Sequence, residues 1–198
     1  MKQIKTLLRT LMNPILAGMF ISLGAYIYFC TPEPLNALLC SIGLIATLHC
    51  HTALYTTTIH LADGTVTLIV LALCYVLNCL GCWLSSLIIT NPCIVAQCEE
   101  IIAQRTELEF WQIILRGMGS GLMLTLCAHC WEKHSWMTLI GVPTCIYAGF
   151  VFPIADTFCY FVSDVPLSFR AILAYHGIII GSFVGGQIYK LGTRRAEQ

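Results

Sequence analysis

At residues 48–58 the chain reads LHCHTALYTTT, and this polar stretch lies inside an apolar run that extends from Leu35 to Leu61. Two histidines and four threonines are costly in a helix that faces lipid. A re-entrant or broken segment tolerates such residues, because its polar groups face protein or a water-filled cavity instead of lipid. The stretch therefore predicts a membrane span that is interrupted along its length.

Residues 149–156, GFVFPIAD, indicate a second interruption, inside the apolar run from Trp136 to Val162. Pro153 removes a helical hydrogen bond and clashes with the preceding turn. Asp156 is an ionisable group at about the depth of the membrane, which marks a functional site by default. The alternative is that Pro153 only kinks a continuous helix and that Asp156 lies at the membrane interface.

The composition is that of a polytopic integral membrane protein and not of a soluble enzyme. Of the 198 residues, 58% are hydrophobic and 10% are charged, whereas a soluble domain carries about 25% charged residues. Apolar runs of about 18 residues are candidate membrane spans, and six are present, at 14–30, 35–61, 65–90, 110–131, 136–162 and 171–191. We therefore predict one all-α transmembrane domain, residues 1–198, and we read the polar stretch at 91–109 as a loop.

The basic residues predict the orientation of the chain. With six spans both termini lie on one side, and seven of the ten Lys and Arg residues then share that side: Lys2, Lys5, Arg9, Lys133, Lys190, Arg194 and Arg195. The positive-inside rule makes this side cytoplasmic. We therefore expect a multi-pass protein of the cell inner (plasma) membrane with cytoplasmic N- and C-termini.

The two halves of the chain resemble each other. The matching pairs are Gly18-Met19 with Gly117-Met118, and Asn78-x-x-Gly81 with Ser182-x-x-Gly185. Because each half holds three spans, the halves must have opposite orientations in the membrane. Such a 3+3 inverted repeat places its substrate site near the membrane midplane, at discontinuous helices. We expect those helices to be the broken second and fifth spans.

These motifs resemble the formate/nitrite transporter family. The residues that carry the resemblance are Ser41-Ile42-Gly43-Leu44-Ile45, Leu54-Tyr55-Thr56, Asn78-x-x-Gly81, Arg116-Gly117 with Leu122-Met123, residues 149–155, and Gly181-Ser182-x-x-Gly185-Gly186. The resemblance implies a homopentamer of six-helix protomers with an aquaporin-like shape and one pore in each protomer. It also implies transport of a small monovalent anion such as formate, nitrite, lactate or hydrosulfide, with the membrane lipid as the surroundings.

The resemblance also implies where the pore residues lie. Leu54, Tyr55 and Leu124 fall at an inner constriction, and Leu44, with Cys40 and residues near Cys145, falls at an outer one. Thr56 falls at the loop break that faces a central chamber. The predicted solute path comprises Leu44, His49, His51, Leu54, Tyr55, Thr56, Asn78, Gly121, Leu124, Phe152, Asp156 and Ser182.

The chain departs from the family pattern at the group that hands a proton to the anion. The central histidine of the family corresponds to Phe152, the acid before it to Val151, and the final asparagine to Asp156. The asparagine of the fourth span corresponds to Gly121. Histidine titrates near neutral pH, and we hypothesise that His51, or else His49, replaces the missing group with Asp156 as its partner. The alternative is that both histidines bond to backbone groups freed at the break.

The sequence is compatible with an anion channel, possible proton linkage included, and with two other functions. A pore without the histidine can instead conduct a small neutral solute. His49, Cys50 and His51 can also be read as ligands for a soft metal in a membrane metal-binding protein. No nucleophile–base pair, phosphate loop or cofactor signature is present, so we expect no enzyme, no catalytic residue, no cofactor, no resident metal and no nucleic-acid partner.

Twelve cysteines invite a disulfide interpretation. Most of them lie in apolar runs, where a thiol behaves as a small hydrophobic side chain. Cys93 and Cys98 lie in the expected loop, and they are the best candidates for a disulfide bridge.

Overall fold

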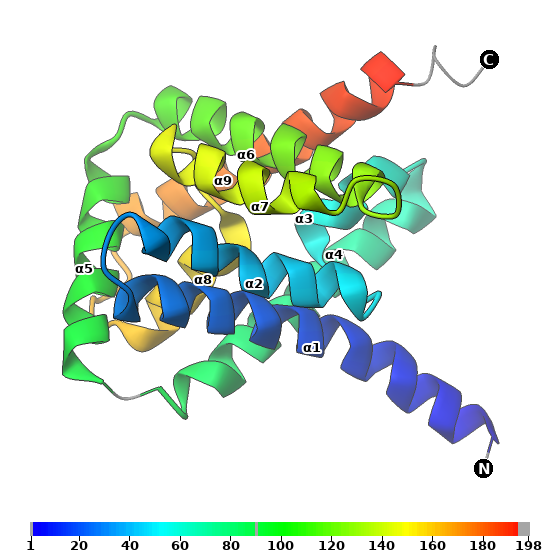
Figure 1. The fold of residues 1–198 in the computed structure, drawn as a ribbon, viewed down its shortest axis with the longest axis horizontal. Coiled ribbons are helices and arrows are strands. Elements are labelled where there is room, and N and C mark those ends of the chain that lie inside the picture. The colour runs from blue at the N-terminus through cyan, green and yellow to red at the C-terminus, as the bar shows by residue number, and fades with distance from the viewer. Residues whose placement is uncertain (1, 90, 194–198) are drawn as a thin grey trace.

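The computed structural model describes residues 2–89 and 91–193, with side chains from residue 10 onward. Helices are the only regular elements in this part of the chain: α1 (Lys2–Cys30), α2 (Leu35–His49), α3 (Tyr55–Thr58), the 3-10 turn η1 (Ile59–Leu61), α4 (Thr65–Ser86), α5 (Pro92–Glu107), α6 (Phe110–Cys130), α7 (Trp136–Tyr147), α8 (Pro153–Val162) and α9 (Phe169–Thr193) (Figure 1). The all-α class is confirmed. Four helices are long and apolar enough to cross a membrane, over residues 10–30, 65–86, 110–130 and 169–193.

Both predicted interruptions are present. The apolar run at 35–61 is divided into α2 and a short helix that α3 and η1 form together, with residues 50–54 between them. The run at 136–162 is divided into α7 and α8, with residues 148–152 between them. We call α3–η1 and α8 the two half-helices, because each begins inside the molecule at one of these breaks.

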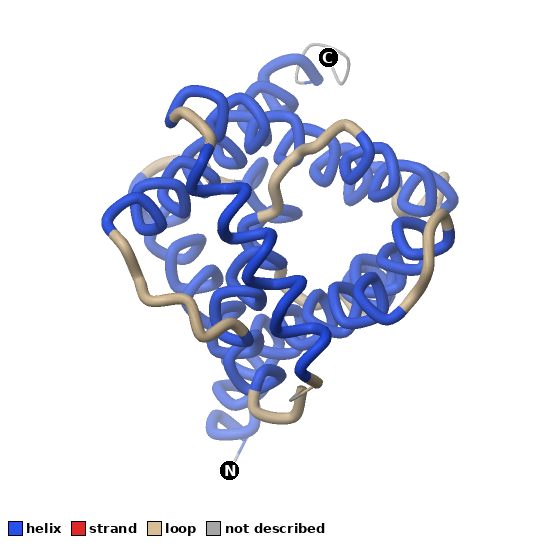
Figure 2. Tube along the Cα trace, turned by 90° about the vertical axis from the view of Figure 1, so that its left-hand side faces the viewer, coloured by secondary structure: helices blue, strands red, loops and turns tan. Residues whose placement is uncertain are grey.

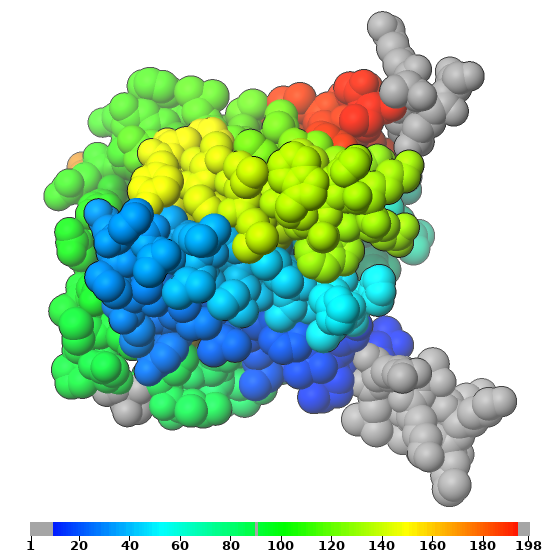
Figure 3. Space-filling model, in the orientation of Figure 1, coloured from blue at the N-terminus to red at the C-terminus, as the bar shows by residue number. Residues whose placement is uncertain are grey.

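The helices pack as two similar sets. Helix α1 packs against α2 and α4, and α6 packs in the same way against α7 and α9. Helices α2 and α7 lie side by side where the two sets meet (Figures 1 and 3). Each half-helix contacts the other set, since α3 packs against α6 and α8 packs against α1 and α4.

Glycines bring the long helices of each set into backbone contact. Gly18 of α1 lies against the carbonyl group of Asn78, and Gly121 of α6 lies against the carbonyl group of Ser182. A Cβ atom at either glycine would overlap that carbonyl. By these contacts Gly121 is the counterpart of Gly18, so the sequence comparison of Gly18 with Gly117 is displaced by one helical turn.

The prediction of a loop at 91–109 is wrong, because residues 92–107 form α5. Asn91 caps the helix by accepting a hydrogen bond from the Cys93 amide (3.0 Å), and Pro92 occupies the first turn, where no amide hydrogen is needed. Ile94, Cys98 and Ile102 are buried along one face. Helix α5 lies across one end of the bundle, nearest the viewer in Figure 2.

The predicted bridge between Cys93 and Cys98 is also absent. Cys93 is exposed and Cys98 is buried, because the two residues point to different sides of α5. All twelve cysteines are free thiols.

The ends of the described chain lie on one side of the molecule. Helix α1 begins and α9 ends at the right of Figure 1, whereas α5 lies at the left. Of the basic residues used to predict orientation, the side chains of Lys2, Lys5 and Arg9 and the whole of Arg194 and Arg195 lie outside the described residues.

Candidate functional site: a cavity between two half-helices

A cavity lies where the two half-helices begin. Its volume is about 50 Å³, which accommodates roughly three or four water-sized molecules. The wall comes from α1, α2, α6, α7 and both half-helices, through Ile21, Cys40, Leu44, Leu54, Thr56, Leu124, Val142, Phe152, Pro153, Ile154 and Ala155. Thr56 contributes the only hydroxyl group among these residues.

Asn13 of α1 forms hydrogen bonds to the non-helical backbone of the first break. Helix α2 ends at His49, and His51 adopts a positive φ of 51°, which turns the chain back into the molecule. The Asn13 amide group donates to the His51 carbonyl (3.1 Å), and its oxygen accepts from the Ala53 amide (2.6 Å). These bonds satisfy backbone groups that a continuous helix would have paired.

Asn78 of α4 fixes the start of α3. Its side-chain oxygen accepts from the Tyr55 amide (2.8 Å), and its nitrogen donates to the carbonyls of Ala53 (2.9 Å) and Pro14 (2.7 Å). Asn78 is fully buried. One side chain therefore links α1, α4 and the first half-helix at the level of the cavity.

Among the residues of the cavity wall, Thr56 has a buried polar side-chain atom without a hydrogen-bond partner. Thr56 is 2% exposed, lines the cavity, and its Oγ1 has no hydrogen-bond partner among the described residues. The hydroxyls of the next two residues are occupied, since Thr57 donates to the Leu54 carbonyl (3.1 Å) and Thr58 donates to the same group (2.9 Å). Three other buried polar side-chain atoms among the described residues also lack partners, on Ser41, His60 and Thr138, but none of these residues lines the cavity. The position of Thr56 in the wall therefore favours a ligand there.

The second break ends at the cavity as well. Gly149 has a φ of +70° and turns the chain away from the axis of α7, just after that helix ends. The Phe150 amide donates to the Cys145 carbonyl (2.9 Å), as at many helix C-termini. Pro153 begins α8 as its first residue, a position where proline costs nothing. Phe152 precedes it in extended conformation, and its side chain forms part of the cavity wall.

A larger cavity, which we call the vestibule, adjoins the first. It has a volume of about 250 Å³ and shares Cys40, Phe152 and Ala155 with the inner cavity. Residues of α5 contribute to its wall, and so do Arg116 of α6 and Asp156 of α8. The vestibule therefore lies on the side of the molecule that α5 covers.

Two arginines and one aspartate line the vestibule. Arg105 Nε donates to Asp156 Oδ2 at 3.2 Å, and the side chains of this pair are 14% and 6% exposed. Arg116 Nη1 lies 3.7 Å from the point that a Cβ on Gly149 would occupy, and it forms no ion pair within the described chain. The formal charge of the three side chains is +2 − 1 = +1.

The structure separates the residues of the predicted solute path into three groups. Leu44, Leu54, Thr56, Leu124 and Phe152 line the inner cavity. Asp156 and Phe152 line the vestibule. His49, His51, Tyr55, Asn78, Gly121 and Ser182 line neither cavity.

The residues of the third group hold helices together or lie at the surface. Tyr55 is buried and donates its hydroxyl to the Ile179 carbonyl (3.2 Å). The Ser182 hydroxyl donates to the Gly117 carbonyl (3.3 Å) between α9 and α6. His49 and His51 are exposed at the end of α2.

The expected pairing of Asp156 with a histidine is wrong, because the partner of Asp156 is Arg105. The residues that the structure describes also contain no group of three His, Cys, Asp or Glu side chains able to hold a metal ion.

Sequence reasoning missed both vestibule arginines. Arg105 lies in the stretch that was read as a loop, and Arg116 was used only as a family match. A signal was present, since Arg105, Arg116 and Arg170 are the three basic residues outside the predicted cytoplasmic side. Ile21 and Val142 of the inner cavity carry no local signal, because they are ordinary members of apolar helices.

Solved structures share this fold. A pentameric formate channel with formate bound aligns with a TM-score of 0.83 and 15% identity, over 98% of this chain and 97% of that chain. An ion channel of the FNT family aligns with a TM-score of 0.79 and 12% identity, over 98% of this chain and 92% of that chain. No family model and no curated protein matches the sequence. The fold is thus that of formate/nitrite transporter channels, as the motifs predicted.

Proposed function

We propose that this chain is a membrane channel for small monovalent anions of weak acids, such as formate, nitrite or hydrosulfide. The observation that carries the proposal is the unpartnered Thr56 hydroxyl in an otherwise apolar cavity. An anion in such a cavity loses its hydration and needs a hydrogen-bond donor. The shared fold with channels, one of them holding formate, supports a channel over an enzyme.

Helix α8 supplies a second attraction for an anion. Three residues of its first turn, Pro153, Ile154 and Ala155, line the cavity, so the amino end of a ten-residue helix faces the solute. The amino end of a helix carries a partial positive charge and unpaired amide groups. Both features stabilise an anion more than a neutral molecule of the same size.

We propose six membrane crossings for this chain. Four are the long helices α1, α4, α6 and α9, and two are composite, α2 with α3–η1 and α7 with α8. The matching contacts of Gly18 and Gly121 support an inverted repeat of three crossings in each half. An even number of crossings also accounts for the ends of α1 and α9 lying on one side, which we propose is cytoplasmic in the inner (plasma) membrane.

A homopentamer is part of the proposal. The structural neighbour that holds formate is pentameric, and α4 exposes an extended apolar face in the single chain, which includes Val66, Ile69, Val70, Leu73 and Val76. In the membrane this apolar face would be buried partly against lipid and partly against neighbouring protomers. Each protomer contains its own cavity, so the pore does not depend on the assembly.

The vestibule would concentrate anions before they reach the inner cavity. Its net charge of +1 lies between walls of low dielectric constant, where a charge acts over a longer distance than in water. Asp156 weakens this attraction, because its carboxylate forms an ion pair with Arg105 and neutralises that positive charge. The vestibule is thus an anion-attracting compartment whose field is partly cancelled from within.

Replacing Asp156 by asparagine should therefore raise formate uptake into proteoliposomes at low salt about two- to fivefold. The substitution raises the vestibule charge to +2, and the asparagine side-chain oxygen can still accept the hydrogen bond from Arg105 that attaches α8 to α5. The increase should vanish in 1 M salt, where charges are screened within about 3 Å. Asp164→Asn, at an exposed position outside the vestibule, is the control, and an equal rise in that variant would contradict the prediction.

Proton linkage by a histidine at the cavity is not part of this proposal. Among the described residues that line the cavity and the vestibule there is no histidine. The sequence resemblance matches Phe152 to the histidine of the family. The apolar wall of the cavity favours one other candidate, a channel for a small neutral solute. The two candidates differ in whether charge moves with the solute.

The deciding experiment is uptake by proteoliposomes that contain the purified full-length chain. Formate, nitrite and hydrosulfide fluxes are followed by stopped-flow methods at several pH values, with urea and glycerol as neutral solutes and empty liposomes as the background. Anion flux well above background, with little urea or glycerol flux, supports the proposal. Passage of the neutral solutes without anion flux would replace it by the second candidate.

A further inference from the structure

The carbonyl end of the half-helix α3–η1 is bound by α9. The half-helix has seven residues, and isolated helices shorter than about 12 residues are marginal in water. A helix end leaves its last carbonyl groups short of partners, and the Ile59 carbonyl accepts one local bond, from the Ala62 amide (3.1 Å). The position of the half-helix must therefore come from contacts with neighbouring elements.

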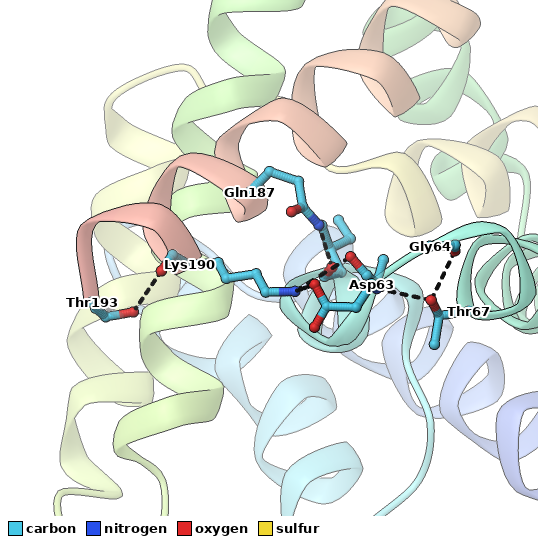
Figure 4. A network of polar contacts seen from close by, with 8 residues as sticks. Asp63, Gly64, Thr67, Gln187, Lys190 and Thr193 are labelled. Carbon is cyan, nitrogen blue, oxygen red and sulfur yellow. Dashed lines mark hydrogen bonds and ion pairs between the residues drawn. The ribbon is translucent and has the colours of Figure 1, made fainter. Parts of the chain in front are cut away.

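Gln187 and Lys190 of α9 supply these contacts (Figure 4). Gln187 Nε2 donates to the Ile59 carbonyl at 2.7 Å, and Lys190 Nζ donates to the Ala62 carbonyl at 3.3 Å. Lys190 Nζ also forms an ion pair with Asp63 Oδ1 at 2.5 Å. We call Asp63, Gln187 and Lys190 the cytoplasmic clamp.

The charges in the clamp suit a helix terminus. The carbonyl end of a helix carries a partial negative charge, and a lysine there is stabilising. The Lys190 side chain is only 10% exposed, whereas Asp63 is 61% exposed, so the ammonium group is the buried member of the pair. Asp63 begins the turn into α4, where its amide donates to Thr67 Oγ1 (2.8 Å).

Close packing links the clamp to the cavity. Gly186, which precedes Gln187, lies against the Ile59 side chain, and a Cβ there would lie 2.6 Å from Ile59 Cγ2. Thr125 of α6 donates to the Thr56 carbonyl at 3.3 Å. The half-helix is thus fixed to α9 at its far end and to α6 near its start, only three residues from Ile59. A displacement at the clamp must reach Thr56, because one short helix connects them.

We infer that the cytoplasmic clamp positions the α3–η1 half-helix, and with it the Thr56 hydroxyl, for the solute in the inner cavity. Gln187 and Lys190 are positioning residues and do not themselves contact the solute. The inference rests on the proposed function for the statement that Thr56 binds a solute. The holding of the half-helix by α9 stands on the contacts alone.

The second half-helix has a comparable attachment. Arg105 of α5 pairs with Asp156 in the first turn of α8. Within the described chain there are two ion pairs: Arg105–Asp156 attaches α8 to α5, and Lys190–Asp63 attaches the turn that follows α3–η1 to α9. Arg105 acts at the end nearer the cavity and Lys190 at the end away from it, so the two half-helices are fixed from opposite sides of the molecule.

The inference is tested by hydrogen–deuterium exchange of the full-length chain, combined with formate uptake by proteoliposomes. Lys190→Met should increase amide exchange in residues 55–63 about tenfold, because a hydrogen bond from a charged donor is lost, and should lower uptake severalfold. Lys190→Arg should restore both. Lys133→Met, at an exposed loop position, is the matched control. Asp63→Asn is a milder variant at an exposed site. It should raise amide exchange in the same residues two- to threefold, because an exposed ion pair contributes little to stability.

Three results would overturn the inference. Exchange in residues 55–63 that is no faster in Lys190→Met and Asp63→Asn than in Lys133→Met means that the clamp does not hold the half-helix. Faster exchange with unchanged uptake means that it does not position Thr56. Failure of Lys190→Arg to restore exchange means that the cation is not the cause. A wild-type chain that passes no anion overturns the proposed function instead, since the exchange comparison is independent of transport.

Discussion

Replacing Thr56 by valine is expected to lower formate uptake about tenfold or more. Valine has nearly the same shape, so the cavity keeps its volume and loses only the hydroxyl group. A hydrogen bond to a charged group contributes about 1.5–3 kcal/mol, and nothing else in the described cavity wall offers a side-chain hydroxyl in its place. Initial uptake rates per reconstituted protein, measured by stopped flow at one pH, give the comparison.

Thr57→Val is the matched control for this variant. Thr57 follows Thr56 in the same half-helix and is 6% exposed, but its hydroxyl bonds to the Leu54 carbonyl and not to a solute. We expect less than a threefold loss of uptake, from the loss of one local hydrogen bond worth about 0.5–1 kcal/mol. Equal losses in the two variants would show that the threonines act by supporting the half-helix and not by binding the anion.

Replacing Asn78 by alanine is expected to destabilise the whole fold. The variant leaves the buried Tyr55 amide without a partner. It also removes one hydrogen bond from each of two carbonyls, that of Ala53, which keeps the Cys74 thiol (3.3 Å), and that of Pro14 inside α1. An unsatisfied buried amide costs about 1–3 kcal/mol and each lost hydrogen bond about 0.5–1.5 kcal/mol, so the free energy of unfolding should fall by about 2–6 kcal/mol. Thermal unfolding of the purified chain in detergent, followed by gel filtration, measures the effect.

Asn36→Ala provides the comparison. Asn36 is also buried, at 8% exposure, but its side-chain oxygen accepts one hydrogen bond, from the neighbouring Ala37 amide (2.7 Å). The loss should stay near 1 kcal/mol, the usual size for one neutral hydrogen bond. If Asn78→Ala unfolded no more readily than Asn36→Ala, the break would not depend on Asn78 for its conformation.

The breaks in the second and fifth spans were predictable from the sequence because they contradict their surroundings. Four threonines near His51, and Pro153 beside Asp156, are unusual in long apolar runs, and both segments are non-helical or begin a new helix in the structure. The outer limits of the second run, Leu35 and Leu61, coincide with the first and last residues of its helices. Hydropathy fixes these limits because lipid tolerates few polar groups.

Helix α5 was missed because composition was given more weight than position. Its polar residues indicated a loop, yet Asn91-Pro92 is a helix start of ordinary type, and Ile94, Cys98 and Ile102 recur every four residues. Such spacing gives one apolar face on an otherwise polar helix. The pattern was present in the sequence. It places Arg105 in a helix, and in the structure the Arg105 side chain pairs with Asp156.

The histidines show why distance along the chain does not predict a site. His49 and His51 lie seven and five residues before Thr56, respectively, but α2 continues to His49 and the chain then reverses at His51. The reversal carries the backbone inward and leaves both side chains exposed. By contrast, Leu124, Val142 and Ile21 come from distant parts of the sequence and meet at the cavity. Only the packed helices bring them together.

The attachment of α3–η1 to α9 also determines when the pore can form during synthesis. The half-helix is made more than 120 residues before its partners Ile179, Gln187 and Lys190, which belong to α9. Until α9 arrives, the carbonyl groups of Ile59 and Ala62 lack the partners they have in the finished protein. A chain halted before residue 179 would therefore lack the attachments of the half-helix to α9, and we expect the passage to become functional only after α9 has been made.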